Sequence, residues 1–143
     1  MIEVQNLTRH FGQKVAVDGL SFQVQQGEVL GFLGPNGAGK STTMKMLAGF
    51  LRPSNGTARI YGYKVQEQPI EVQRRLGYLP EGAPLYADMT VAELLNFVAA
   101  ARGYKKQERI KKADTVVEQV HLGNVLHQPI ETLSKGFKRR VGL

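Results

Sequence analysis

The sequence predicts an α/β fold with a helical subdomain inserted after about residue 80. Three observations support this. Strand patterns and one helix fill the first half of the chain, helical patterns fill the second half, and a glycine-rich loop joins a short apolar run to a helix. We expect residues 1–80 to form a β subdomain together with the core that carries the loop. Residues 81–143 should form the helical subdomain.

The predicted strands of the first half come in order along the chain. Ile2 and Val4 alternate with polar residues, which indicates a first strand, and 14–18 and 20–24 read as two more. Residues 28–33 (EVLGFL) form a nearly continuous apolar run, as expected of a strand that is buried on both faces. Shorter strands are predicted at 57–61 and 77–79.

Helices are predicted from good helix formers and from capping signals. Residues 40–50 and 69–76 should be helical, and 80–88, with two prolines and a glycine, should be a loop. Thr90 and Glu93 have the spacing of a capping box, followed by apolar residues on one helical face. A further helix should end at Gly123, and a basic helix should begin after Leu133-Ser134-Lys135-Gly136-Phe137.

Composition limits the class of protein and its partners. The chain has 143 residues, a net charge of +7, a pI of about 9.8 and no cysteine, which excludes disulfides and thiol chemistry. Residues 1–100 carry nine Lys/Arg and eight Asp/Glu, and residues 101–143 carry ten and four. The basic second part is either an ordinary solvated face or a surface for acidic partners. We see no signal peptide and no apolar run of the roughly 20 residues that span a bilayer.

The glycine-rich loop matches the phosphate-binding pattern G-x-x-x-x-G-K-[ST]. Glycines let successive backbone N–H groups point inward at an anion, and the helix that follows adds the positive end of its dipole. Lysine supplies a charge to the β- and γ-phosphates, and a serine hydroxyl can ligate Mg²⁺. The nucleotide-binding residues are predicted to be Gly34, Pro35, Asn36, Gly37, Ala38, Gly39, Lys40, Ser41 and Thr42.

Three motifs in order carry a resemblance to a known family. GPNGAGKST at 34–42, GYLPE at 77–81 and LSKGF at 133–137 resemble the motifs of the ATP-binding domain of an ABC transporter. The likeness covers the whole chain. It implies an ABC-type P-loop core with an antiparallel β subdomain and an inserted helical subdomain, ending C-terminally truncated inside the helix after the signature. No N-K-x-D motif is present, which argues against an ordinary GTPase.

The resemblance implies further site residues. Phe11 matches the aromatic residue on which the family stacks adenine, a contact worth about 1–3 kcal/mol. Glu81 stands where the family has glutamine. A carboxylate suits Mg²⁺, so Ser41 and Glu81 are the candidate metal ligands. The alternatives are that Phe11 simply packs and that Glu81 is an ordinary exposed carboxylate.

The signature segment departs from the usual Leu-Ser-Gly-Gly-Gln, because Lys135 replaces the first glycine and Phe137 replaces the glutamine. By resemblance, Ser134 and Gly136 contact the γ-phosphate held by a second ATP-binding subunit. Lys135 either adds charge beside that phosphate or faces solvent.

The remaining expectations concern partners. By resemblance, a membrane-spanning subunit docks near Gly82–Asp88, where Leu85 and Tyr86 are either exposed or folded back onto the helices. The GYLPEGAPLYADMTV stretch resembles export-type members. The protein would lie at the cytoplasmic face of the cell membrane, and we expect no nucleic acid partner.

The family's second Mg²⁺-binding Asp and its water-orienting Glu have no counterpart before Leu143. We therefore expect the intact protein to be an ATPase and these residues alone to turn over ATP slowly or not at all. Two alternatives stay open: an ABC-type ATPase that acts on nucleic acid or the ribosome, favoured by the basic second part, and a nucleotide-binding module without turnover.

Overall fold

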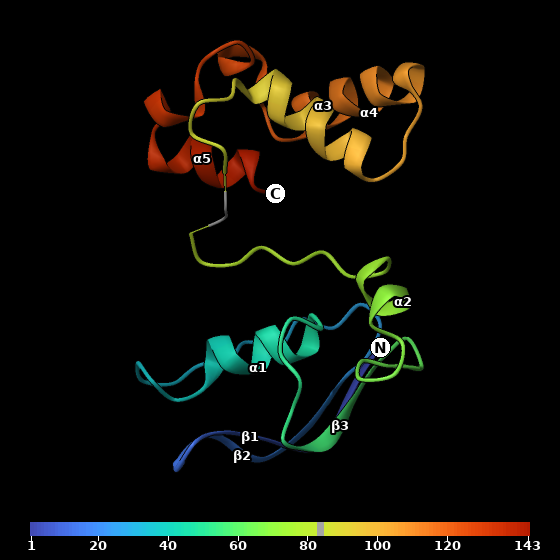
Figure 1. The fold of residues 1–143 in the computed structure, drawn as a ribbon, viewed down its shortest axis with the longest axis vertical. Helices are drawn as coiled ribbons and strands as arrows, with labels where there is room; N and C mark the ends of the chain where they lie inside the picture. Colours follow the sequence, from blue (N-terminus) through green and yellow to red (C-terminus); the bar gives the residue numbers. More distant parts are fainter. Residues whose placement is uncertain (83–84) are drawn as a thin grey trace. The chain divides into compact units, whose positions relative to one another are not determined.

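The computed structural model describes residues 1–82 and 85–143, which divide into two compact units (Figure 1). The first, Met1–Tyr78, contains the sheet and is called the β unit here. The second, Leu79–Leu143, is the helical unit. Each unit has its own cluster of buried apolar residues. No helix within the described ranges combines the length and the apolar character that crossing a bilayer requires.

The β unit is built on a four-stranded antiparallel sheet with the order β2-β1-β3-β4. These strands are β1 (Ile2–Phe11), β2 (Lys14–Val24), β3 (Asn55–Ile60) and β4 (Tyr63–Lys64). β1 and β2 form a long hairpin whose pairing runs from Ile2 opposite Val24 to Phe11 opposite Lys14. The antiparallel β subdomain expected from the sequence is therefore confirmed.

The prediction of two separate strands between Lys14 and Val24 was wrong. β2 is one strand, and Gly19 adopts a left-handed φ of 53° within it. The register between β1 and β2 shifts at several points along this stretch. Such irregularities let a strand stay paired where its alternation of apolar residues breaks. The break in the pattern at Gly19 therefore marks a bulge and not a turn.

Two helices pack against the sheet and close the core of the β unit. They are α1 (Lys40–Leu47) and α2 (Pro69–Gln73). Both are shorter than predicted. At the end of α1, the N–H groups of Gly49 and Phe50 donate to the carbonyls of Met46 and Lys45, which is a Schellman cap. The buried core residues are Val4, Leu7, Val17, Met46, Leu47, Ala58, Ile60, Val65 and Val72.

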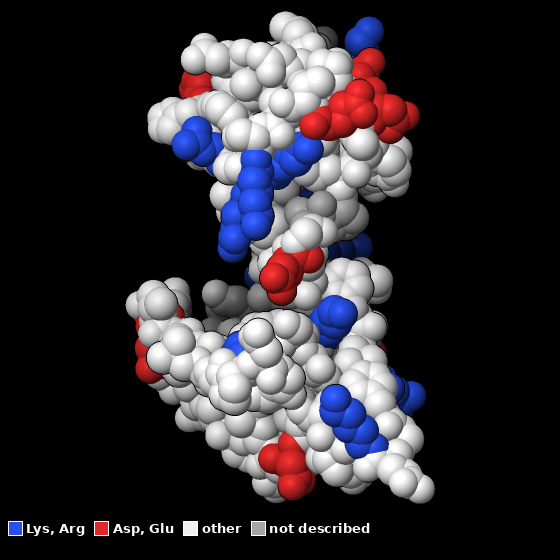
Figure 2. Space-filling view, turned by 90° about the vertical axis from the view of Figure 1, so that its left-hand side faces the viewer, with Lys and Arg blue, Asp and Glu red and all other residues white. Residues whose placement is uncertain are grey.

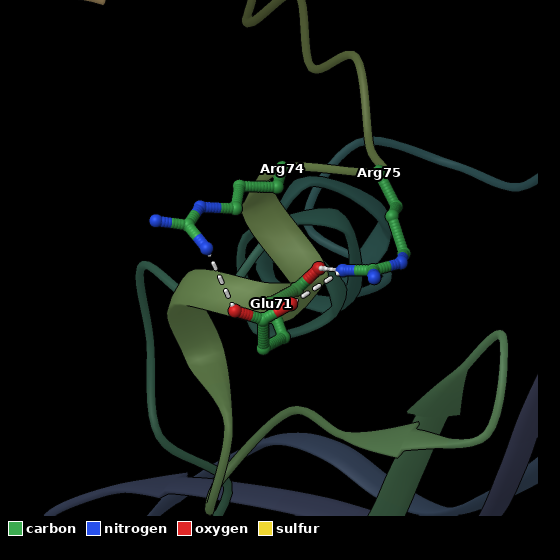
Figure 3. A network of polar contacts seen from close by, with 3 residues as sticks. All are labelled: Glu71, Arg74 and Arg75. Atoms are coloured by element: carbon green, nitrogen blue, oxygen red, sulfur yellow. Dashed lines mark hydrogen bonds and ion pairs between the residues drawn. The ribbon is translucent and has the colours of Figure 1, made fainter.

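A small polar network surrounds α2 (Figure 3). The Glu71 carboxylate accepts hydrogen bonds from Arg75 Nη1 at 2.7 Å and Arg74 Nη1 at 2.9 Å. The hydrogen bond from Arg75 is the main cause of a lowered pKa at Glu71. The Arg75 guanidinium also lies 4.3 Å from the ring centroid of Tyr63. These contacts are exposed, so each contributes little, but together they connect α2 to β4.

Two further predicted strands, at 28–33 and 77–79, do not form. In the first of them Val29 and Leu33 are each 95% exposed, so the prediction of a strand buried on both faces was wrong within the described chain. A strand needs neighbours that pair with its N–H and C=O groups, and the described sheet consists of β1 to β4 alone. Phe32, by contrast, packs on Phe22 of β2, with 5.3 Å between the ring centroids.

The helical unit contains α3 (Val91–Ala101), α4 (Lys106–Gln119) and α5 (Lys135–Val141). Two 3₁₀ turns, η1 (Gly123–Val125) and η2 (Ile130–Thr132), lie between α4 and α5. α3 and α4 form an antiparallel pair. The core of this unit consists of Val91, Leu94, Leu122, Val125, Ile130, Leu133 and Val141.

The ends of these helices test the capping predictions. The Glu93 N–H donates to Thr90 Oγ1 at 3.2 Å, and the Thr90 N–H donates to Glu93 Oε2 at 2.8 Å, so the capping box is confirmed. Hydrogen bonds from Thr90 also lower the pKa of Glu93. The prediction that Gly123 ends the next helix was wrong. His121 takes the left-handed position after α4, with φ 55°, and Gly123 instead begins η1.

The capping box gives a first testable prediction. Thr90→Ala removes the side-chain acceptor of the Glu93 N–H and should lower the free energy of unfolding by about 1 kcal/mol. Urea denaturation followed by circular dichroism measures this loss. Thr115→Ala is the matched control, because Thr115 Oγ1 bonds the Lys111 carbonyl inside α4 and caps nothing. Equal losses for the two variants would contradict the assignment of the cap.

Candidate functional site

The phosphate-type loop occupies residues 34–39 of the β unit and leads directly into α1. Gly39 is the N-cap of α1, and no side chain caps the first turn of the helix. The first N–H groups of a helix have no partner within the helix, and they carry the positive end of its dipole. The start of α1 therefore offers backbone donors to an anion.

Gly39 is fixed in place by a very close approach to β2. A Cβ atom at this position would lie 2.3 Å from the carbonyl oxygen of Ala16 and 3.0 Å from a methyl group of Val17. Gly39 also has a left-handed φ of 85°. Only glycine satisfies both demands, because it has no Cβ and populates positive φ freely. The second glycine of the motif thus seats the loop on the sheet.

Lys40 folds its side chain back over the loop. Its Nζ atom donates to the carbonyl of Gly34 at 2.6 Å and to the carbonyl of Pro35 at 2.7 Å. An ammonium group has three donors, so two are satisfied by the loop itself. The positive charge is thereby held among the backbone groups of the loop.

The other predicted loop residues differ in their exposure. Ser41 is exposed on the first turn of α1, and Thr42 is half-buried. The next residue, Thr43, is buried, and its hydroxyl donates to the Gly39 carbonyl at 3.0 Å. Thr43 is thus occupied within the fold. The exposed members of the loop are Gly34, Pro35, Asn36, Gly37 and Ala38.

Phe11 ends β1 and is 48% exposed. The guanidinium carbon of Arg9 lies 4.7 Å from the centroid of its ring, which is a cation–π contact. The sequence reasoning missed Arg9. Spacing could have indicated the contact between Arg9 and Phe11, since residues i and i+2 of a strand lie on the same face.

The chain belongs to the ABC transporter family. The family model described as "ABC transporter" matches residues 17–143. An uncharacterised ABC transporter ATP-binding protein of Methanocaldococcus jannaschii is 39% identical over 140 residues, which are 98% of this chain and 49% of that protein. The linearmycin resistance ATP-binding protein LnrL of Bacillus subtilis is 36% identical over 143 residues, 100% of this chain and 46% of that protein.

A solved structure confirms the fold. It is a dimeric ATP-binding cassette in a post-hydrolysis state, bound to ADP and Pi, with a TM-score of 0.84 and 21% identity over 99% of this chain and 67% of that chain. The family resemblance predicted from the three motifs is confirmed by the family model that matches residues 17–143. The chain spans about half the length of the two curated relatives.

Glu81 and the LSKGF segment at 133–137 lie in the helical unit. Glu81 and Lys135 line the same pocket, which has a volume of about 740 Å³. Glu131, Lys138 and Arg139 add further charges to its wall. Figure 2 looks onto the α5 side of this unit and shows Lys and Arg side chains gathered there. Lys135 therefore lines this pocket together with two other cations and two carboxylates, and Glu81, one of the carboxylates, is exposed.

The predicted metal ligands belong to different units, with Ser41 in the β unit and Glu81 in the helical unit. Each is exposed and presents an oxygen atom of the kind that Mg²⁺ prefers. Within the described residues, no group of three or more His, Asp or Glu side chains has the arrangement of a metal site.

Ser134 is the N-cap of α5, and its Oγ accepts from the Phe137 N–H at 3.3 Å. A hydroxyl that accepts one hydrogen bond still has its own proton to donate. At Gly136 an added Cβ would meet, among the described residues, Ser134 Oγ at 3.8 Å, an ordinary contact. The fold itself therefore does not require glycine at position 136.

Leu85 and Tyr86 take different positions after the undescribed pair. Leu85 is half-buried against the helical core, whereas Tyr86 is 52% exposed and packs edge-to-face on Phe97 at 5.5 Å. The part of the predicted 80–88 loop that falls on residues 83–84 lies outside the described residues.

The contact between Gly39 and β2 gives a second prediction. Gly39→Ala and Gly37→Ala both place a side chain at a φ near 85°, which costs about 1–2 kcal/mol. At Gly37 a Cβ meets nothing within 4 Å, whereas at Gly39 it collides with Ala16. Gly39→Ala should therefore lose about 1–3 kcal/mol more stability than Gly37→Ala. Thermal unfolding of both variants measures the difference, and equal melting temperatures would contradict this packing.

Proposed function

We propose that the intact protein binds ATP with Mg²⁺ on the loop 34–41 and hydrolyses it to drive transport through a membrane-spanning partner. The observation that carries the proposal is Lys40, whose ammonium group is held among the loop carbonyls at the N-terminus of α1. A triphosphate needs a fixed positive charge together with convergent N–H donors, and this loop supplies both. Membership of the ABC transporter family supports the choice of ATP.

Each part of the nucleotide has a proposed receptor. Backbone groups of the loop and Lys40 take the phosphates, and Thr42 adds a hydrogen bond. Phe11 is exposed enough to stack on the adenine. Mg²⁺, held by Ser41 and Glu81 with the nucleotide's own oxygens, would neutralise phosphate charge.

A second ATP-binding subunit completes the site in this proposal. Ser134, Lys135 and Gly136 would approach the γ-phosphate held by the other subunit. Ser134 keeps its hydroxyl proton free while it caps α5, and Gly136 leaves room for a ligand to approach the backbone. The dimeric state of the solved cassette also supports this arrangement.

The membrane-spanning partner is proposed to dock near Gly82–Asp88, part of which lies outside the described residues. Tyr86 supports the choice, because it presents an aromatic ring that is about half exposed. Such a partner would hold the protein at the cytoplasmic face of the membrane. The drug-resistance role in the name of the Bacillus subtilis relative favours export over import.

Removal of the lysine charge is the main test. Lys40→Ala should weaken Mg-ATP binding by about 100-fold, because the phosphates lose a charged hydrogen-bond donor. Isothermal titration calorimetry of the intact protein measures this. Lys45→Ala is the matched control, since Lys45 is exposed in the last turn of the same helix and its loss should leave ATP binding normal. If Lys40→Ala bound Mg-ATP as well as Lys45→Ala, the proposed site would be wrong.

Metal dependence tests Glu81 separately. A carboxylate near the phosphates repels them until a cation is present, so ATP binding should depend more strongly on Mg²⁺ in the wild-type protein than in the Glu81→Gln variant. The measurement is ATP affinity with Mg²⁺ and with EDTA for both proteins. We expect the ratio of the two affinities to fall about 3-fold to 10-fold in Glu81→Gln. An unchanged ratio would remove Glu81 from the metal site and leave the phosphate loop unaffected.

A further inference from the structure

Arg9 holds an unusual position beside Phe11. Its guanidinium group lies over one face of the Phe11 ring, at 4.7 Å from the centroid. The same group donates through Nη1 to the backbone carbonyl of Arg52 at 2.8 Å. Arg52 belongs to the segment that follows α1, so Arg9 is attached to backbone 43 residues away in the sequence. These two contacts therefore restrict the movement of the guanidinium group.

A second atom of Arg9 shows that this arrangement leaves a hydrogen-bond donor unsatisfied. Its Nε is buried and has no hydrogen-bond partner in the described part of the chain. Buried donors without partners are rare in folded proteins and call for a specific explanation. The contacts offer the ring of Phe11 as the explanation, because a guanidinium that lies over a ring and donates to Arg52 has little freedom to turn its Nε toward another acceptor.

The segment around Arg9 is itself firmly anchored. The His10 N–H donates to Ser54 Oγ at 3.1 Å, and the Ser54 N–H donates to the Thr8 carbonyl at 2.8 Å. On the other side, Arg9 pairs with Val17 in β2. Val17 in turn packs against Gly39, where an added Cβ would lie 3.0 Å from a Val17 methyl group. The base of the Phe11 side chain thus belongs to the same rigid frame as the phosphate loop.

From this geometry we propose that Arg9 is a positioning residue for the nucleobase: it occupies one face of Phe11 and so presents the opposite face, pre-oriented, to the base of the bound nucleotide. This inference rests on the proposed function, because it takes Phe11 as the stacking platform. A ring at a strand end otherwise rotates about its side-chain bonds, and fixing it before binding removes an entropic cost. The bound arrangement is a three-layer stack of guanidinium, phenyl ring and base.

The test compares two ligands that share a triphosphate and differ in the base. Mg-ATP engages both the loop and Phe11, whereas Mg-tripolyphosphate engages the loop alone. In the intact protein, Arg9→Ala and Arg9→Lys should weaken Mg-ATP by about 3-fold to 10-fold and leave Mg-tripolyphosphate unchanged. Arg9→Lys keeps the charge and a donor for Arg52 but lacks the planar group, so it separates stacking from simple attraction of phosphate.

Two controls sharpen the comparison. Arg52→Ala removes a neighbouring positive charge and keeps the backbone carbonyl that Arg9 uses, so both affinities should stay close to wild type. Phe11→Ala should weaken Mg-ATP selectively, and adding Arg9→Ala to it should have no further effect, because the two residues act as one unit. Melting temperatures of all variants confirm that each protein is folded.

The outcomes separate the inference from the function on which it rests. Equal weakening of both ligands by Arg9→Ala, or an effect that adds to that of Phe11→Ala, would overturn the positioning role of Arg9 alone. If Phe11→Ala leaves Mg-ATP binding unchanged, Phe11 is not the platform, and both the stacking part of the proposed function and this inference fail. Loss of binding in Lys40→Ala tests the loop independently of either result.

Discussion

The close approach of Gly39 to the Ala16 carbonyl is the constraint on which the β unit depends. It brings the end of the phosphate loop to within van der Waals distance of β2, and β2 is paired along its length with β1. Because β1 carries Arg9 and Phe11, a single backbone contact relates the phosphate-type loop to the aromatic side chain. A second close approach, of Gly56 to the Asn6 carbonyl, fixes the start of β3 on β1 in the same way. Glycine is needed at these two positions for space as well as for φ.

In the helical unit, the sequence could predict those features that depend on residues close to one another in the chain. The capping box at Thr90 and Glu93 depends on residues within a few positions of one another. The basic helix was predicted to begin after Phe137, but α5 begins at Lys135, with Ser134 as its N-cap. The end of α4 could not be predicted in this way. Glycine usually takes the left-handed position after a helix, and here His121 takes it, two residues earlier than Gly123. Burial of the adjacent Leu122 in the core of this unit is a tertiary effect that the sequence pattern does not express.

The apolar run 28–33 shows the same limit for strands. Its apolar composition predicted burial, but a strand forms only where other strands pair with it, and the composition of the segment holds no information about its neighbours. The described sheet consists of β1 to β4 and does not include this segment. Val29 and Leu33 are exposed, whereas Phe32 packs on Phe22. The prediction of a strand buried on both faces was therefore wrong for this segment.

The candidate site, too, has parts that could be predicted from local sequence and parts that could not. The loop from Gly34 to Ser41 is a local motif, and its glycines and lysine could be identified by spacing alone. The contacts that order its side chains are partly local and partly not. Within the loop, Lys40 directs two of its three donors to the carbonyls of Gly34 and Pro35, so one donor remains. Arg9, which lies over the Phe11 ring, is held by a hydrogen bond to the carbonyl of Arg52, 43 residues away. In both cases folding already orders the side chain, so in the proposed site more of the contact energy would remain for the ligand.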